Sequence, residues 1–118
     1  MIAASLALLI AAPAPDAFLA RMQRRWVPAC DTVEAITNVT ARFRLNKAGY
    51  LAGDPVIIDR RTGLQIDPAR PDAASAGAAA AGERAKKAIV SGQPYADVPP
   101  ALVGRTLNLD FNAQAACS

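Results

Sequence analysis

The sequence predicts a small α+β domain, built in the order helix, strand, strand, helix, strand. Two observations predict this class. Apolar and polar residues alternate over residues 39–45 and 105–112, as in half-buried strands, and two other stretches carry apolar residues at helical spacing. A chain of 118 residues fits one domain, and much of its 53% hydrophobic content is alanine, so we expect a thin core.

The first helix is predicted over Asp16–Trp26. Phe18, Met22 and Trp26 recur at intervals of four and would form one apolar stripe. Asp16 is expected to cap this helix, because a carboxylate at the N-cap accepts a hydrogen bond from the backbone of the first turn.

The first strand is predicted over Val33–Asn46, where an apolar and a polar face alternate with a period of two. The apolar face holds Val39, Ala41, Phe43 and Leu45, and the polar face holds Thr40, Arg42 and Arg44. Residues Asn46–Gly49 then predict a hairpin turn, with Gly49 suited to a positive φ.

The second strand is predicted over Tyr50–Asp59, with an interruption at Gly53-Asp54-Pro55. Because proline lacks the N–H that a sheet ladder needs, we expect this strand to lie at a sheet edge or to carry a bulge. The alanine-rich stretch Asp72–Ser91 predicts the second helix, although its composition also fits a low-complexity linker. The last strand is predicted over Arg105–Asn112.

Handedness and pairing rules suggest how these strands are arranged. The first two form a hairpin, and the helix that follows carries the chain back to a third strand parallel to the second. The simplest arrangement places the third strand on the far side of the first. The sheet is therefore predicted to have the order 2-1-3, with the helices packed on one face.

This order brings the beginning of the first strand close to the end of the third, where the two cysteines lie. Cys30 and Cys117 have no CxxC spacing, and the chain has no histidine to complete a zinc site. We therefore expect them to form one structural disulfide in an oxidising compartment, with two free thiols as the alternative.

Residues 1–14 form an apolar run that ends in small residues, with Ala12-Pro13-Ala14 resembling a cleavage site. The run is shorter than the roughly 20 residues of a membrane span but has the length of a signal-peptide core. We expect a signal peptide here, with a buried N-terminal helix as the alternative, and the folded domain over residues 15–118.

Residues for catalysis are missing from the sequence. Without histidine there is no Ser-His-Asp or Cys-His arrangement, and the only two glutamates, Glu34 and Glu83, have no aspartate at a motif spacing. No phosphate-binding glycine loop occurs. A net charge of +3, spread along the chain, gives no basic patch for nucleic acid. We expect neither an enzyme nor a metal, small-molecule cofactor or nucleic acid partner.

The sheet edge formed by the last strand is the candidate functional surface. It holds no proline or lysine that would block pairing, so it can accept an added strand from a partner. The expected partner-binding residues are Arg105, Thr106, Leu107, Asn108, Leu109, Asp110, Phe111 and Asn112. Alternatively, the tail Ala113–Ser118 covers this edge.

An ordered series of short motifs over about residues 16–112 resembles the TolA/TonB C-terminal domain superfamily, and within it the periplasmic TolA C-terminal domain. The series comprises Trp26-Val27-Pro28, Arg42-Phe43-Arg44-Leu45-Asn46, Gly49, Leu51-Ala52-Gly53-Asp54-Pro55-Val56, Arg84-Ala85, Ala88-Ile89, Gln93-Pro94-Tyr95, Val98-Pro99, and Leu107, Leu109 and Phe111. No single motif is specific; their order along the chain is what carries the resemblance.

The resemblance implies a periplasmic domain without enzymatic activity, serving Tol-Pal envelope integrity or an energy-transducer-like role. It also implies that the last strand receives the partner by strand addition. The implied partners are a TolB/Pal-like envelope protein or peptide, a segment of an outer-membrane transporter, or a phage or bacteriocin domain. The alternative is a secreted structural or inhibitory domain that shares the fold but has a closed edge.

Overall fold

The computed structural model describes residues 14–67, 70 and 75–117 of the chain. The predicted signal peptide therefore lies, except for Ala14, outside the described residues, as does the predicted beginning of the second helix at Asp72. The elements, in chain order, are α2 (Pro15–Gln23), a 3-10 turn η1 (Val33–Ile36), β1 (Asn38–Phe43), β2 (Val56–Asp59), α3 (Ala78–Ser91), a 3-10 turn η3 (Pro100–Leu102), β3 (Leu107–Asn112) and α4 (Ala113–Ala116).

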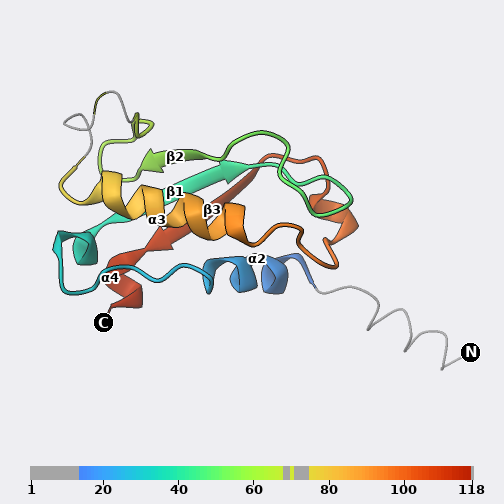
Figure 1. The fold of residues 1–118 in the computed structure, drawn as a ribbon, viewed down its shortest axis with the longest axis horizontal. Coiled ribbons are helices and arrows are strands. Elements are labelled where there is room, and N and C mark those ends of the chain that lie inside the picture. The colour runs from blue at the N-terminus through green and yellow to red at the C-terminus, as the bar shows by residue number, and fades with distance from the viewer. Residues whose placement is uncertain (1–13, 68–69, 71–74, 118) are drawn as a thin grey trace, which may run out of the picture.

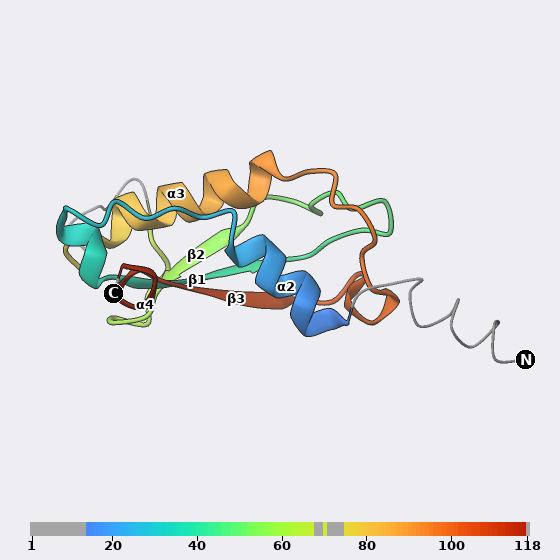
Figure 2. The same ribbon diagram turned by 90° about the horizontal axis from the view of Figure 1, so that it is seen from below.

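The three strands form one antiparallel sheet in the order β2-β1-β3, which confirms the predicted fold class and strand order. Figure 1 shows β1 in the centre of this sheet. In the register, Ala41 lies between Ile57 of β2 and Leu109 of β3. Figure 2, turned by 90°, shows α3 lying across one face of the sheet.

The core lies between the sheet and the helices. Its buried side chains come from alternate positions of the strands and from one stripe of each helix: Val39, Ala41, Phe43, Ile57, Leu107, Leu109 and Phe111 from the strands, and Phe18, Met22, Ala81, Ala85 and Ile89 from the helices. The predicted stripe of α2 is thus confirmed, with Trp26 buried just after the helix ends at Gln23. The small alanine side chains let α3 pack closely on the sheet.

The beginning of the first helix differs from its prediction. Asp16 lies in the first turn and is not the N-cap; the N-cap is Ala14, without a side-chain hydrogen bond. Pro15 occupies the first helical position, where its missing N–H leaves no bond unmade.

The predicted first strand begins five residues too early. Val33–Ile36 is a 3-10 turn, because the Thr32 side chain accepts a hydrogen bond from the Glu34 N–H and the Thr37 N–H donates to the Glu34 carbonyl. The strand proper is Asn38–Phe43, and Leu45 continues it only as a single bridge to Leu51.

The second strand is also shorter than predicted. The hairpin turn at Asn46–Gly49 is present, with Gly49 N–H donating to the Asn46 carbonyl at 3.0 Å. The chain then leaves the ladder through Gly53, which has a φ of +90°, and β2 begins only at Val56. The last strand begins at Leu107 rather than Arg105, because the Arg105 N–H turns back to the Leu102 carbonyl.

Candidate binding edge of the sheet

The outer edge of β3 presents main-chain hydrogen-bonding groups to solvent. The Ala113 N–H donates to the Thr37 carbonyl of the β1 side at 3.0 Å. Since neighbouring residues of a strand point their main-chain groups to opposite sides, the odd-numbered residues of β3 bind β1 and the even-numbered ones face outward. The outward groups of the strand's middle belong to Asn108 and Asp110.

One protein group reaches these outward positions in the described part of the chain. The Gln23 side-chain amide of α2 donates to the Asp110 carbonyl at 2.7 Å. No other hydrogen bond among the described residues involves the N–H or C=O of Asn108, or the N–H of Asp110. This stretch of β3 is therefore an open edge, and among the described residues its outward main-chain groups receive a single side-chain hydrogen bond.

The opposite edge of the sheet is closed by its own chain. After β2 the chain turns back at residues 60–63, so that the Asp59 N–H donates to the Leu64 carbonyl at 2.9 Å and the Ile66 N–H donates to the Ile57 carbonyl at 2.8 Å. Pro55 precedes β2, and β2 lies at a sheet edge, one of the two placements expected for a strand that proline interrupts. Residues 64–66 cover this edge, because their main chain binds the outward Asp59 N–H and the outward Ile57 carbonyl of β2.

The eight predicted partner-binding residues fall into three groups. Arg105 and Thr106 precede β3. Leu107, Leu109 and Phe111 turn their main-chain groups to β1, and their side chains are buried in the core. Asn108, Asp110 and Asn112 alternate with them, and their side chains are exposed on the sheet face that lies opposite the core.

From Ala113 to Cys117, the tail of the chain does not run along the β3 edge. It forms the short helix α4, which packs against η1 at the end of the sheet. The Asn112 side chain accepts a hydrogen bond from the Ala115 N–H and so caps α4. The element that flanks β3 is instead α2, as Figures 1 and 2 both show.

A hollow of about 480 Å³ lies between α2, the second half of β3 and α4. Its walls include Gln23, Trp26, Asp110 and Ala115. The Trp26 ring packs edge-on against Phe111, with 5.3 Å between ring centroids. The Trp26 Nε1 group is buried and has no acceptor among the described residues, which leaves an unmade hydrogen bond beside the open edge.

Polar side chains of β1 and β3 are joined in rows across the open sheet face. The Thr40 hydroxyl donates to Asp110 Oδ1 at 2.6 Å. In the next two rows, Arg42 Nε donates to Asn108 Oδ1 and Arg44 Nε donates to Thr106 Oγ1, both at 3.1 Å. The sequence identified these polar positions but not their pairing, which depends on the register of β1 and β3.

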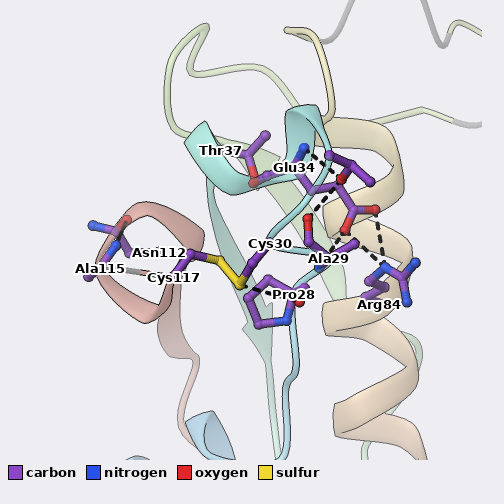
Figure 3. The surroundings of a disulfide bond; sticks show 10 residues. Pro28, Ala29, Cys30, Glu34, Thr37, Arg84, Asn112, Ala115 and Cys117 are labelled. Atoms are coloured by element: carbon purple, nitrogen blue, oxygen red, sulfur yellow. Dashed lines mark hydrogen bonds and ion pairs between the residues drawn. A yellow bond between two sulfur atoms is a disulfide. The ribbon is translucent and has the colours of Figure 1, made fainter.

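A disulfide joins Cys30 to Cys117, as predicted, and closes the two ends of the folded chain at a Cα–Cα distance of 5.5 Å. Figure 3 shows it between the loop before η1 and α4. The buried Glu34 carboxylate of η1 accepts hydrogen bonds from the Ala29 N–H of this loop and from Arg84 Nε of α3, the closest at 2.9 Å. This loop is thereby attached to both α3 and α4.

No family model matches this chain, and neither a curated protein nor a solved structure matches it. Within the described ranges, no helix is long and apolar enough to cross a membrane, and no group of three or more metal-binding side chains is present.

Proposed function

We propose that this chain is a non-enzymatic binding domain of the TolA/TonB C-terminal type, which works in the periplasm and receives a strand of an envelope partner at the β3 edge. The observation that carries the proposal is the difference between the two sheet edges. The outward N–H and C=O of Asn108 and the N–H of Asp110 have no hydrogen-bond partner in the described chain, and the Asp110 carbonyl has only the Gln23 side chain, whereas the β2 edge is occupied by residues 64–66. A partner strand supplies the main-chain hydrogen bonds that an open edge lacks.

Two further features support a periplasmic strand-binding domain. The disulfide fits a protein that folds in an oxidising compartment. The order of the elements and the β2-β1-β3 sheet agree with the resemblance of the motif series. The partners proposed on this basis are a segment of a TolB/Pal-like protein or of an outer-membrane transporter, and a phage or bacteriocin domain.

The alternative is a secreted structural or inhibitory domain whose edge stays closed. One observation favours it: α2 flanks β3, and its Gln23 side chain already binds the Asp110 carbonyl. A single side-chain hydrogen bond contributes only about 0.5–1.5 kcal/mol, so a pairing strand can replace it. The two functions differ in whether the edge binds a strand.

The test uses an Asn108→Pro variant, because the Asn108 N–H faces outward and its loss leaves the β1–β3 ladder intact. Proline is tolerated at such an edge position, and its ring blocks strand addition there. The full oxidised chain, immobilised, is used to capture proteins from solubilised cell envelopes of its own host. We expect the wild type to retain a specific envelope protein and Asn108→Pro to lose it.

Asn108→Ala is the matched control, since it removes the side chain but keeps the main-chain N–H. It should capture the same protein as the wild type. Equal capture by Asn108→Pro, with its amide spectrum otherwise native, would rule out strand addition at β3 and favour the closed-edge alternative.

A further inference from the structure

Two arginine side chains extend from the central strand and the residues after it toward the open edge. Arg42 lies in β1, and Arg44 follows the end of that strand. Both side chains cross the exposed sheet face: Arg42 Nε donates to Asn108 Oδ1 of β3, and Arg44 Nε donates to Thr106 Oγ1 just before β3. Their guanidinium groups thus lie over the strand next to which a partner would be added. A strand added there would lie about 4.8 Å from β3.

Neither guanidinium has a carboxylate partner in the described part of the chain. The ion pairs found there join Arg60 to Asp110 and Arg84 to Glu34. Arg42 and Arg44 bind only neutral oxygens through Nε, and a guanidinium carries five N–H donors. Each therefore keeps positive charge and donors that this chain does not use.

The row formed by Thr40 and Asp110 carries a negative side chain instead of an arginine. There the Asp110 carboxylate is bound by Arg60 at 2.8 Å and by the Thr40 hydroxyl at 2.6 Å. Asp110 is thus already matched by a cation of its own chain. The unmatched positive charge of the face is confined to the two rows of Arg42 and Arg44.

We infer that the strand received at β3 is an extended peptide with two acidic side chains, two residues apart, on the side facing Arg42 and Arg44. This inference rests on the proposed function and deepens it by stating the partner's chemistry. Side chains two residues apart lie on one face of a strand, roughly 6.7 Å apart, and Arg42 and Arg44 are likewise two residues apart in extended chain. Carboxylates of the partner then pair with the two guanidinium groups while its main chain pairs with Asn108 and Asp110.

The same geometry sets the other positions of the partner. Beside Asp110 the partner carries a neutral or basic residue, because a third carboxylate would meet a like charge. Its alternate side chains face the helix side of the sheet, toward the hollow beside Trp26, and are apolar. The expected pattern is acidic-apolar-acidic-apolar, followed by a residue that is not acidic.

The probes are three blocked peptides of the pattern Val-Xaa-Val-Xaa-Val-Gln-Val, in which Xaa is glutamate, glutamine or lysine and the glutamine keeps the position beside Asp110 neutral. Each is titrated into the full oxidised chain, and the amide signals of Asn108 and Asp110 are followed by NMR at low ionic strength. We expect the glutamate peptide to bind roughly fivefold more tightly than the glutamine peptide, as two exposed ion pairs allow, and more tightly than the lysine peptide. The difference should shrink in high salt.

The variant Arg42→Gln/Arg44→Gln should bind the glutamate and glutamine peptides equally well. The matched control, Lys86→Gln/Lys87→Gln, removes the same charge from α3 and should keep the preference. If the wild type binds both peptides at β3 with equal affinity, the acidic specificity is wrong, while strand addition stands. If no peptide shifts the β3 amides, both the proposed function and this inference fail.

A last experiment measures binding of the chain to vesicles, because the phosphate of a lipid headgroup also pairs with guanidinium groups. It compares anionic phosphatidylglycerol vesicles with phosphatidylcholine vesicles, which carry no net charge. Binding to these vesicles that requires Arg42 and Arg44, without any preference for the glutamate peptide, would overturn the inference and assign the face to an anionic membrane surface. Absence of vesicle binding together with the peptide preference supports an acidic strand.

Discussion

The Gln23 side-chain amide donates a 2.7 Å hydrogen bond to the main-chain carbonyl of Asp110, and so joins α2 to the otherwise open edge of β3. Gln23 is half-buried at the end of α2, and the bond spans 87 positions of the sequence. A strand that pairs with β3 at this point has to compete with it. The residue therefore limits how readily the edge accepts a partner.

Removing this side chain should strengthen strand binding. Gln23→Ala frees the Asp110 carbonyl, and the net worth of one such bond predicts an affinity gain of about threefold for the valine–glutamate peptide, measured by NMR titration. Gln65→Ala, the same substitution beside the closed β2 edge, is the control and should leave the affinity unchanged. Weaker binding by Gln23→Ala would show that Gln23 holds the receiving edge in place instead of guarding it.

Two glycines with nearly the same backbone angle should differ strongly in their tolerance of alanine. Gly49 and Gly53 have φ values of +89° and +90°. A Cβ at Gly49 would clash with the Tyr95 carbonyl oxygen, whereas a Cβ at Gly53 would meet nothing within 4 Å. Gly53→Ala should therefore cost only the backbone strain, about 1–2 kcal/mol, and Gly49→Ala at least about 3 kcal/mol.

Urea unfolding of both variants measures this difference directly. The comparison tests how the hairpin turn packs, because the Gly49 carbonyl also accepts a hydrogen bond from the Tyr95 N–H at 2.9 Å. Equal losses in the two variants would mean that the turn does not pack on Tyr95 as the structure has it.

The strand order could be predicted because it depends on local patterns and general pairing rules. Alternation in β1 and β3 fixes which side chains enter the core, as Val39 and Phe111 show, and right-handed crossover leaves few topologies. The disulfide could be predicted because that topology brings Cys30 and Cys117 to the same end of the sheet. The sequence could not show which main-chain groups of β3 point away from β1 and which bind it, because this depends on the register of the two strands.

Element boundaries depended on contacts between distant residues. The chain at Val33–Ile36 alternates only weakly, and Glu34 turns inward to bind Arg84, 50 positions away. Gly77, with a φ of +81°, lies just before α3 and against the Val33 carbonyl, so the helix begins there and not earlier. The return of residues 64–66 along β2 has no pattern in the sequence that would have predicted it.

Loss of the disulfide should destabilise the domain severely. Cys30 and Cys117 are 87 positions apart, and closing a loop of this length restricts the unfolded chain by about 4–5 kcal/mol on the chain-entropy model. That is a large part of the stability of a small domain. Thermal unfolding followed by circular dichroism should show a midpoint about 20 °C lower with reductant.

The Cys30→Ser/Cys117→Ser variant is the control for the unfolding experiment with reductant. Its midpoint should match that of the reduced wild type and should not respond to reductant. A wild-type midpoint that reductant leaves unchanged would contradict a stabilising role for the bond.

Asp59 should make stability depend on pH in the acid range. Its side chain is buried at the end of β2 and accepts hydrogen bonds from the Ser75 N–H at 2.7 Å and the Arg61 N–H at 3.0 Å. Burial by itself raises the pKa of this carboxyl, but the hydrogen bonds from Ser75, Arg61 and Thr62 outweigh it and hold the pKa below its ordinary value of 3.8.

A carboxyl whose pKa is lower in the folded state stabilises the fold while it is ionised. This contribution is fully present above the unfolded-state pKa and is lost as the pH falls through the folded-state pKa. Asp59→Asn should therefore be less stable than the wild type by about 2 kcal/mol at pH 7, and the gap should narrow as the pH falls below about 4. Urea unfolding from pH 7 to pH 2 measures this difference in stability. Asp54→Asn is the control, because Asp54 is exposed. A gap that stays constant over this range would mean that Asp59 contributes by packing and not by its charge.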